Sequence, residues 1–188
     1  LEFRRVLFRS DDGRLLAPLA YVAVTIASQS LTVFLLGYRR TSAAIAAIGG
    51  GVLVFILFTG RLSGPPRLIL WAALISGGVA AVTLTVKSAF ARGVPPVQRI
   101  FCGASAYVML GFVFAAFHGL AGFLLGGGYA LQPGLENLRS IRWSDYIWLS
   151  FATLTTAGFG DVVSVGSVPS ALATLEAIAG VLFPATLI

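Results

Sequence analysis

Residues 144–161 read Ser-Asp-Tyr-Ile-Trp-Leu-Ser-Phe-Ala-Thr-Leu-Thr-Thr-Ala-Gly-Phe-Gly-Asp, and they carry the most specific structural information in the sequence. Its apolar part, residues 146–155, is too short to cross a bilayer, because a crossing helix needs about 20 residues. We therefore expect a short helix that enters the membrane and turns back. The glycines that follow it, Gly158 and Gly160, stand at alternate positions, which indicates a backbone that is neither a helix nor an ordinary strand.

The composition of the whole chain is that of a membrane protein. Of its 188 residues, 57% are hydrophobic and 11% are charged, and the mean hydropathy is +0.93. A soluble domain needs more polar surface than this. The formal charge of +6 does not indicate nucleic-acid binding, because the cations stand between apolar runs and do not gather on one face. The single cysteine, Cys102, excludes an intrachain disulfide and a cysteine-based zinc site.

Four long apolar runs precede the quoted stretch, and a fifth follows it. With their flanking arginines and turn residues, they predict helices over residues 15–38, 41–59, 68–91, 99–126 and 169–188. Thr41 or Ser42 is expected to cap the second of these helices. Residues 1–14 show no clear role, and we expect them to be a cloning or sequence-assembly remnant.

Basic residues predict how the helices are oriented in the membrane. Arg39 and Arg40 lie two spans away from the group of Lys87, Arg92 and Arg99, so both sets should share one side, the cytoplasm. The quoted stretch then lies outside, as does the start of the first helix. Because the chain looks incomplete at both ends, we expect one more helix upstream and six spans in the full protein.

The quoted stretch resembles the pore loop of potassium channels, whose signature is Thr-x-x-Thr-Val-Gly-Tyr-Gly-Asp. The residues that match this signature are Thr153, Thr156, Gly158, Gly160 and Asp161. Ala157 replaces the usual valine, and Phe159 replaces the usual tyrosine. Residues 175–180, Leu-Glu-Ala-Ile-Ala-Gly, also look like the inner helix of small bacterial ion-channel proteins.

The resemblance implies an all-α integral membrane fold. Residues 97–188 would form a pore module of outer helix, re-entrant pore helix, selectivity filter and inner helix, preceded by a bundle of three transmembrane helices in residues 15–92. It implies a potassium-selective channel in the lipid bilayer of the cell membrane, with the bacterial inner membrane expected. Because each chain supplies one filter strand, four copies should surround the pore as a homotetramer. K⁺ is then the permeant ion, and no cofactor is expected.

The implied selectivity filter is Thr156, Ala157, Gly158, Phe159 and Gly160, with K⁺ held at the first four. A potassium ion that enters a pore loses its water and needs equivalent oxygens in return. Backbone carbonyls supply them where consecutive carbonyls point at one axis, and glycine adopts the required angles at little cost. The short helix, expected to be capped by Ser144 with Asp145 in its first turn, directs its negative C-terminal end at the cation.

The expected supports of this filter are Trp148, Asp161, Thr153 and Thr155. Trp148 stands where the family places a tryptophan whose indole N–H binds the aspartate after the filter, here Asp161. The next position holds Leu149 where a second tryptophan is common, and Phe159 has no hydroxyl to receive its bond. We therefore expect a filter braced by packing, and weaker discrimination against sodium.

Three residues of the last helix are candidates for gating: Glu176, Gly180 and Pro184. Glu176 either faces the ion path or bonds the threonines of the re-entrant helix. Gly180 is either a hinge, with a bend at Pro184, or a site of close helix packing. His118, in mid-span, either senses pH or bonds a neighbouring helix, and we favour the bond. The aromatic residues expected in the outer interface belt are Tyr129, Trp143 and Tyr146.

Other functions remain open at the level of sequence. The same architecture with looser filter chemistry would be a weakly selective monovalent cation channel. A secondary transporter with a broken helix, or a non-conducting regulatory subunit, would also fit the apolar runs. An enzyme is not expected, because no nucleophile is paired with a base and no nucleotide motif stands out. The gating stimulus, and a second pore loop or regulatory domain beyond residue 188, are not indicated by the sequence.

Overall fold

A computed structural model of the chain describes residues 37–59, 65–132 and 141–187, together with residues 23, 26, 27, 30, 31, 33 and 34. Residues 1–14 and most of the helix expected over residues 15–38 lie outside the described residues. The described elements are α3 (Arg39–Thr59), α4 (Pro65–Ala89), α5 (Pro96–Leu125), β1 (Tyr129–Leu131), α6 (Trp143–Leu154), β2 (Val162–Ser164) and α7 (Ser167–Leu187).

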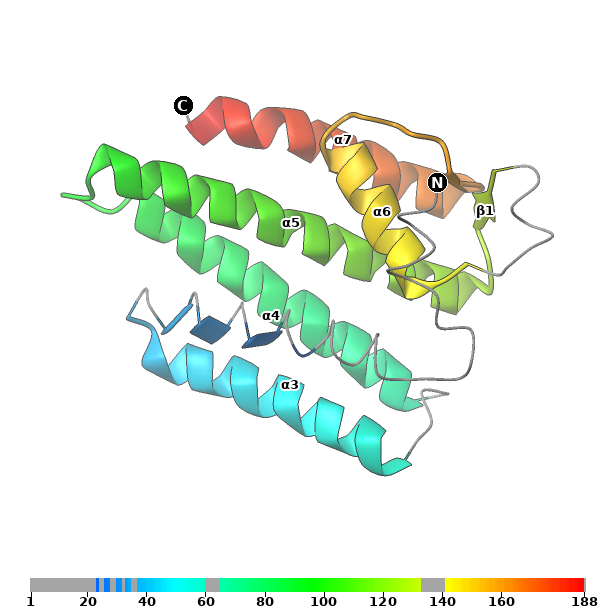
Figure 1. Ribbon diagram of the computed structural model, residues 1–188, viewed down its shortest axis with the longest axis horizontal. Coiled ribbons are helices and arrows are strands. Elements are labelled where there is room, and N and C mark those ends of the chain that lie inside the picture. Colours follow the sequence, from blue (N-terminus) through cyan, green and yellow to red (C-terminus); the bar gives the residue numbers. More distant parts are fainter. Residues whose placement is uncertain are drawn as a thin grey trace, which may run out of the picture.

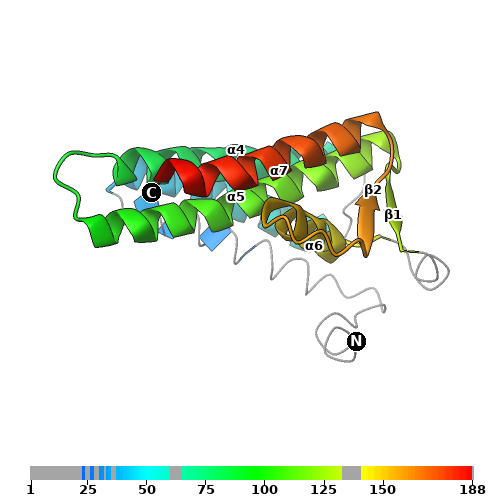
Figure 2. The same cartoon turned by 90° about the horizontal axis from the view of Figure 1, so that it is seen from above.

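The long helices are arranged around α5. Figure 1 shows α3, α4, α5 and α7 running side by side in that order, with the short helix α6 across α5 and α7 near one end. α5 packs against α4, α6 and α7, and α6 packs against both α5 and α7. Figure 2 shows that α6 and the β1–β2 ribbon lie to one side of the long helices. The helical fold that the composition predicts is confirmed.

Three of the described helices are long and apolar enough to cross a membrane. The segments with this length and composition are Trp71–Ala89 in α4, Pro96–Leu125 in α5 and Ser167–Thr186 in α7. In α3 the apolar segment within the described side chains is shorter, Ser42–Gly51. α6 has 12 residues, which is too few for a crossing, as the sequence predicts. The chain is therefore a multi-pass membrane protein.

Two expected helix caps are wrong. α6 begins at Trp143 and not near residue 146, and the Asp145 carboxylate reaches back to accept the backbone N–H of Arg142 (2.8 Å). Because this carboxylate already satisfies the start of the helix, Ser144 lies inside the first turn and is not the cap. α3 begins at Arg39, ahead of both proposed caps, and the Ser42 hydroxyl donates to the Ser30 carbonyl oxygen (2.7 Å).

A short antiparallel ribbon joins the segments before and after α6, and the sequence did not predict it. Tyr129 lies opposite Ser164 in this ribbon, and Leu131 lies opposite Val162. Tyr129, Leu131 and Val162 are buried in a small cluster with Leu149 of α6. Two strands of three residues carry too little alternation of polar and apolar residues to be recognised in the sequence. The ribbon holds the end of the loop that follows α6.

Most of the described basic residues lie at one end of the molecule, and Arg67 near the start of α4 and Arg142 before α6 are the exceptions. α3 begins, α4 ends and α5 begins at the same end, where Figure 1 also shows the C-terminus. The β1–β2 ribbon and the start of α7 lie at the opposite end. The prediction that Arg39 and Arg92 share a side is therefore confirmed by the fold, and the segment after α6 returns to the other side.

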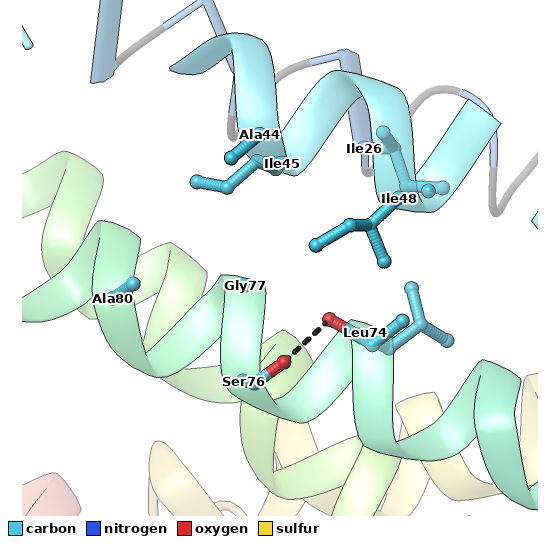
Figure 3. Close-up of a pocket in the computed structure, with 10 residues that line it drawn as sticks. Ile26, Ala44, Ile45, Ile48, Leu74, Ser76, Gly77 and Ala80 are labelled. Carbon is cyan, nitrogen blue, oxygen red and sulfur yellow. Dashed lines mark hydrogen bonds between the residues drawn. The ribbon is translucent and has the colours of Figure 1, made fainter. Parts of the chain in front are cut away.

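A small apolar cavity of about 140 Å³ lies between α3 and α4 (Figure 3), and its lining residues do not include any from α6. Ile26, Ile45, Ile48 and Leu74 supply its larger side chains. Its one hydroxyl, that of Ser76, donates to the Ala73 carbonyl oxygen of its own helix (3.3 Å). None of the described residues that line this cavity has a titratable or charged side chain, so they do not make it a candidate for chemistry.

Labelling from the two sides of the membrane tests this arrangement. In a Cys102→Ala background, we expect Val165→Cys to react with a membrane-impermeant maleimide in intact cells. Arg92→Cys should react only after the membrane is opened, because Arg92 lies at the opposite, basic end and both positions are exposed. Labelling of both cysteines from the same side would contradict the assignment.

Candidate functional site

The candidate site is the segment that connects α6 to β2. It leaves the C-terminal end of α6 and returns toward the β1–β2 ribbon (Figure 1). Residues 155–160 are all exposed in the single chain, and Phe159 has 60% of its surface exposed. Such exposure of a short uncharged segment, in a chain of spanning helices, leaves its backbone accessible to a ligand or to other copies of the chain.

The backbone of this segment alternates in handedness. Thr156, Gly158 and Gly160 have positive φ angles of 57°, 56° and 74°, while Ala157 and Phe159 between them do not. In an ordinary strand successive carbonyls point in opposite directions, whereas a backbone that alternates in handedness is able to point them toward the same side. Among the described residues, no backbone hydrogen bond is accepted by the carbonyl oxygens of residues 156–160. The segment therefore presents a row of carbonyl oxygens to which no backbone N–H of the described residues donates.

Thr156 holds a strained backbone angle. A positive φ in a β-branched residue is a true outlier and costs on the order of 1–3 kcal/mol. Two backbone hydrogen bonds tie this part of the segment to the last turn of α6: Thr156 N–H donates to Thr153 O (2.9 Å), and Gly158 N–H donates to Ala152 O (3.1 Å). Strain of this kind persists only where surrounding contacts impose it, so α6 fixes the start of the segment.

The residues expected to support the segment lie close to it. The rings of Trp148 and Phe159 are stacked, with centroids 5.0 Å apart and planes 24° from parallel. The Asp161 carbonyl oxygen accepts the N–H of Gln132 (2.9 Å), which links the end of the segment to β1. The Thr155 hydroxyl donates to the Phe151 carbonyl oxygen (2.6 Å). Sequence reasoning did not foresee the stacked pair, and the bond from Trp148 to Asp161 stays a prediction.

Behind α6 lies a buried polar network. The His118 ring of α5 contacts the Tyr129 hydroxyl through Nδ1 (2.8 Å) and Glu176 Oε2 of α7 through Nε2 (2.9 Å). Glu176 Oε1 is hydrogen-bonded to the Ser150 hydroxyl of α6, which also reaches the Gly111 carbonyl oxygen (2.7 Å). Glu176, His118 and Ser150 are all 0% exposed.

This network corrects one interpretation of Glu176 and confirms that of His118. The prediction that His118 bonds a neighbouring helix is confirmed. The prediction that Glu176 bonds threonines of the re-entrant helix is wrong, because its partner on α6 is Ser150. Glu176 is enclosed by α5, α6 and α7 of its own chain, so its carboxyl group does not face an ion path.

Sequence reasoning missed Ser150 and Tyr129 as members of the network. Tyr129 was expected in an interface belt, yet it is only 8% exposed and packs edge-on against Tyr146, with centroids 5.1 Å apart. Burial raises the pKa of Tyr129 well above its usual range, and the nearby acidic groups of Tyr146 and Glu176 raise it further. Its hydroxyl therefore keeps its proton at neutral pH and is able to donate it.

Gly180 stands where α7 meets the end of α6. A Cβ atom at this position would overlap the Leu154 carbonyl group, and the same oxygen accepts the Tyr107 hydroxyl (2.9 Å). Close packing alone therefore accounts for a glycine at residue 180. α7 continues as a helix through Pro184 to Leu187, so Pro184 does not end it.

The contact at Gly180 predicts a steric effect. Gly180→Ala should lower the stability of the folded protein by about 1–3 kcal/mol, because the added methyl group must displace the backbone of α6. The matched control is Gly51→Ala in α3, where a Cβ atom meets nothing within 4 Å. We expect that control to be neutral or slightly stabilising. Thermal unfolding in detergent measures both, and equal stabilities of the two variants would contradict the close contact.

Comparison with known proteins finds a family model that matches the part of the chain that contains this site. Residues 106–188, which include most of α5 and all of α6, the candidate segment and α7, match the family model described as ion channel. No curated protein and no solved structure matches the chain. This family comprises channels and not enzymes. The match covers residues 106–188, less than half of the chain, and it is consistent with the pore-loop potassium-channel family that the segment resembles.

Proposed function

We propose that this chain is one subunit of a homotetrameric potassium channel. In this proposal K⁺ crosses the membrane while bound to the carbonyl oxygens of Thr156, Ala157, Gly158 and Phe159, with Gly160 completing the filter. The observation that carries the proposal is the alternating backbone of an exposed segment whose carbonyls accept no backbone hydrogen bond. K⁺ is the transported ion here, and backbone oxygens are the ligands that suit it.

Several copies are needed to complete such a site. One chain contributes a single row of oxygens, whereas an ion without its water needs oxygens on all sides, which a closed ring of identical chains provides. α7 has exposed surface for this assembly. In the single chain 17% of its apolar membrane-spanning segment is buried, compared with 39% for α5 and 28% for α4. Its exposed apolar side chains include Leu175, Ile178 and Leu182. They are available to neighbouring copies and to lipid.

The short helix supports a cation at its C-terminal end. α6 carries Asp145 in its first turn and no basic residue in its last turn, so no side-chain cation of its own offsets its negative end. Such a helix end stabilises a nearby cation by about 0.3–1 kcal/mol per helix, and four copies would act together.

The start of α6 is held by a ring contact with α4. The ring centroids of Trp71 on α4 and Trp143 on α6 are 4.7 Å apart.

The basic end of the molecule is proposed to face the cytoplasm. In this orientation the filter opens outward, and the protein is a multi-pass protein of the cell membrane, of bacterial inner-membrane type by the resemblance of its inner helix. Residues 97–188 then form the pore module, and residues 15–92 form a bundle beside it.

Substitution of Gly158 tests the proposal. Gly158→Ala should reduce K⁺ flux into proteoliposomes by about tenfold or more, because an L-residue at this positive φ costs roughly 1–2 kcal/mol in every subunit. Nothing lies within 4 Å of the added Cβ atom in the single chain, so the loss is expected from a turned carbonyl and not from unfolding.

The control for this substitution is Val163→Ala on β2, which should leave flux and assembly unchanged. Crosslinking should show assemblies of four copies for the wild type, Gly158→Ala and Val163→Ala. Flux that is unchanged in Gly158→Ala would contradict the filter. Saturable transport without single-channel currents would instead favour the transporter, and a silent wild type would favour the regulatory subunit.

A second candidate, a weakly selective cation channel, is favoured by the contact at Phe159. This side chain has no hydroxyl, and among the described residues its ring contact is the stacked Trp148. An aromatic pair contributes about 0.5–1.5 kcal/mol, less than a full set of hydrogen bonds around a rigid filter. The filter is then held loosely enough for Na⁺ to compete.

Reversal potentials in mixed Na⁺ and K⁺ distinguish the two candidates. We expect a preference for K⁺ in the wild type, and a two- to tenfold smaller permeability ratio in Trp148→Ala, from the roughly 0.5–1.5 kcal/mol of the lost ring contact. Val165→Ala, an exposed residue outside the filter, serves as the control. An unchanged ratio in Trp148→Ala would show that stacking does not brace the filter, and no preference in the wild type would select the second candidate.

A further inference from the structure

In the buried network behind α6, the contacts themselves determine which atoms carry hydrogen. It is one continuous chain of contacts that runs from the Tyr129 hydroxyl through His118, Glu176 and Ser150 to the Gly111 carbonyl oxygen. It joins the ribbon, α5, α7 and α6 in turn. Because its central side chains are 0% exposed, every donor and acceptor in it must be satisfied within the protein.

The Ser150 hydroxyl determines which atoms donate and which accept along the network. It has one hydrogen atom and lies within hydrogen-bond distance of two oxygens, Gly111 O and Glu176 Oε1. The Gly111 carbonyl has no hydrogen to give, so it must receive that of Ser150. The second contact then needs a hydrogen atom on Glu176 Oε1, which is present only when the carboxyl group is protonated.

The rest of the chain follows from this assignment. With the proton on Oε1, Glu176 Oε2 is an acceptor, so His118 Nε2 carries a hydrogen atom and donates to it. The neutral ring then accepts at Nδ1 from the Tyr129 hydroxyl. Each hydrogen bond has one donor and one acceptor, and no member carries a charge.

We propose that Glu176 is an uncharged carboxylic acid that donates to Ser150 and thereby positions α6 against α7. The other arrangement is an ion pair of Glu176 with a protonated His118. It would leave one of the two Ser150 contacts as an oxygen–oxygen contact without hydrogen, which is costly in a buried site.

The surroundings of Glu176 favour the uncharged form. The titratable groups that face it are His118 and Tyr107 of α5, Tyr129 of β1 and, behind Tyr129, Tyr146 of α6. Within the described part of the chain, no lysine or arginine forms an ion pair with Glu176. Apart from His118, none of these facing groups becomes a cation to balance a buried carboxylate.

The position of the acid gives it a role at the candidate filter. Ser150 lies in the second half of α6, and the strained segment begins directly after this helix. Glu176 is one turn before Gly180, where α7 touches Leu154 at the end of α6. α6 is therefore held against α7 at two points, by a hydrogen bond and by close packing. That these two contacts hold the filter in place rests on the proposed function, whereas the protonation of Glu176 does not depend on it.

Infrared spectroscopy tests the protonation without any measurement of flux. The chain has only seven aspartate and glutamate residues, so a single protonated carboxyl group is resolvable. At neutral pH we expect a carboxylic-acid C=O band in the purified wild type that is lost in Glu176→Gln and shifted in Ser150→Ala. Glu2→Gln, outside the described residues, is the control and should retain the band.

The variants have different expected activities. Glu176→Gln keeps a donor toward Ser150 and an acceptor toward His118, so its K⁺ flux should stay within about twofold of the wild type. Glu176→Ala leaves the His118 N–H without a partner and should lose most of the flux.

Each outcome bears on a separate claim. A wild type without the carboxylic-acid band, or a band that Ser150→Ala leaves unshifted, would overturn the protonation and its direction, whether or not the protein conducts. These two measurements do not require Glu176→Gln to fold. Glu176→Gln flux as low as that of Glu176→Ala, with the band present in the wild type, would overturn the positioning role alone.

Discussion

The carbonyl oxygens of residues 156–160 impose the main constraint on the segment after α6, because each of them needs a partner. Among the described residues they accept no backbone hydrogen bond, and φ is positive at Thr156, Gly158 and Gly160. Backbone oxygens in this condition require water or a cation. In the proposed channel, copies of this row from neighbouring chains line the ion path and supply the cation with its oxygens.

The surrounding elements hold this row in place by different means. α6 fixes its start through two backbone hydrogen bonds, and the stacked Trp148 contacts its middle at Phe159. The ribbon fixes its end at Asp161 through Gln132. α6 is in turn held by Glu176 and Gly180 of α7. The strain at Thr156, on the order of 1–3 kcal/mol, is sustained by this set of contacts.

Much of this was predictable from the sequence, and the reason differs between elements. Apolar length predicted the helices, and the spacing of Gly158 and Gly160 predicted a backbone that only glycine adopts easily. The caps at Ser144 and Ser42 were wrong, because cap preference does not show where the apolar face of a helix begins. The partners of Glu176 depend on the rotation of three helices, which no local pattern encodes.

The most direct test of this account is the position of bound ions in the assembled protein. A structure determined with Rb⁺ or Tl⁺, which replace K⁺ and scatter strongly, should show a row of ion density on a fourfold axis, lined by the carbonyl oxygens of residues 156–159. A monomeric particle, or a segment directed away from any shared axis with no ion beside it, would contradict the account.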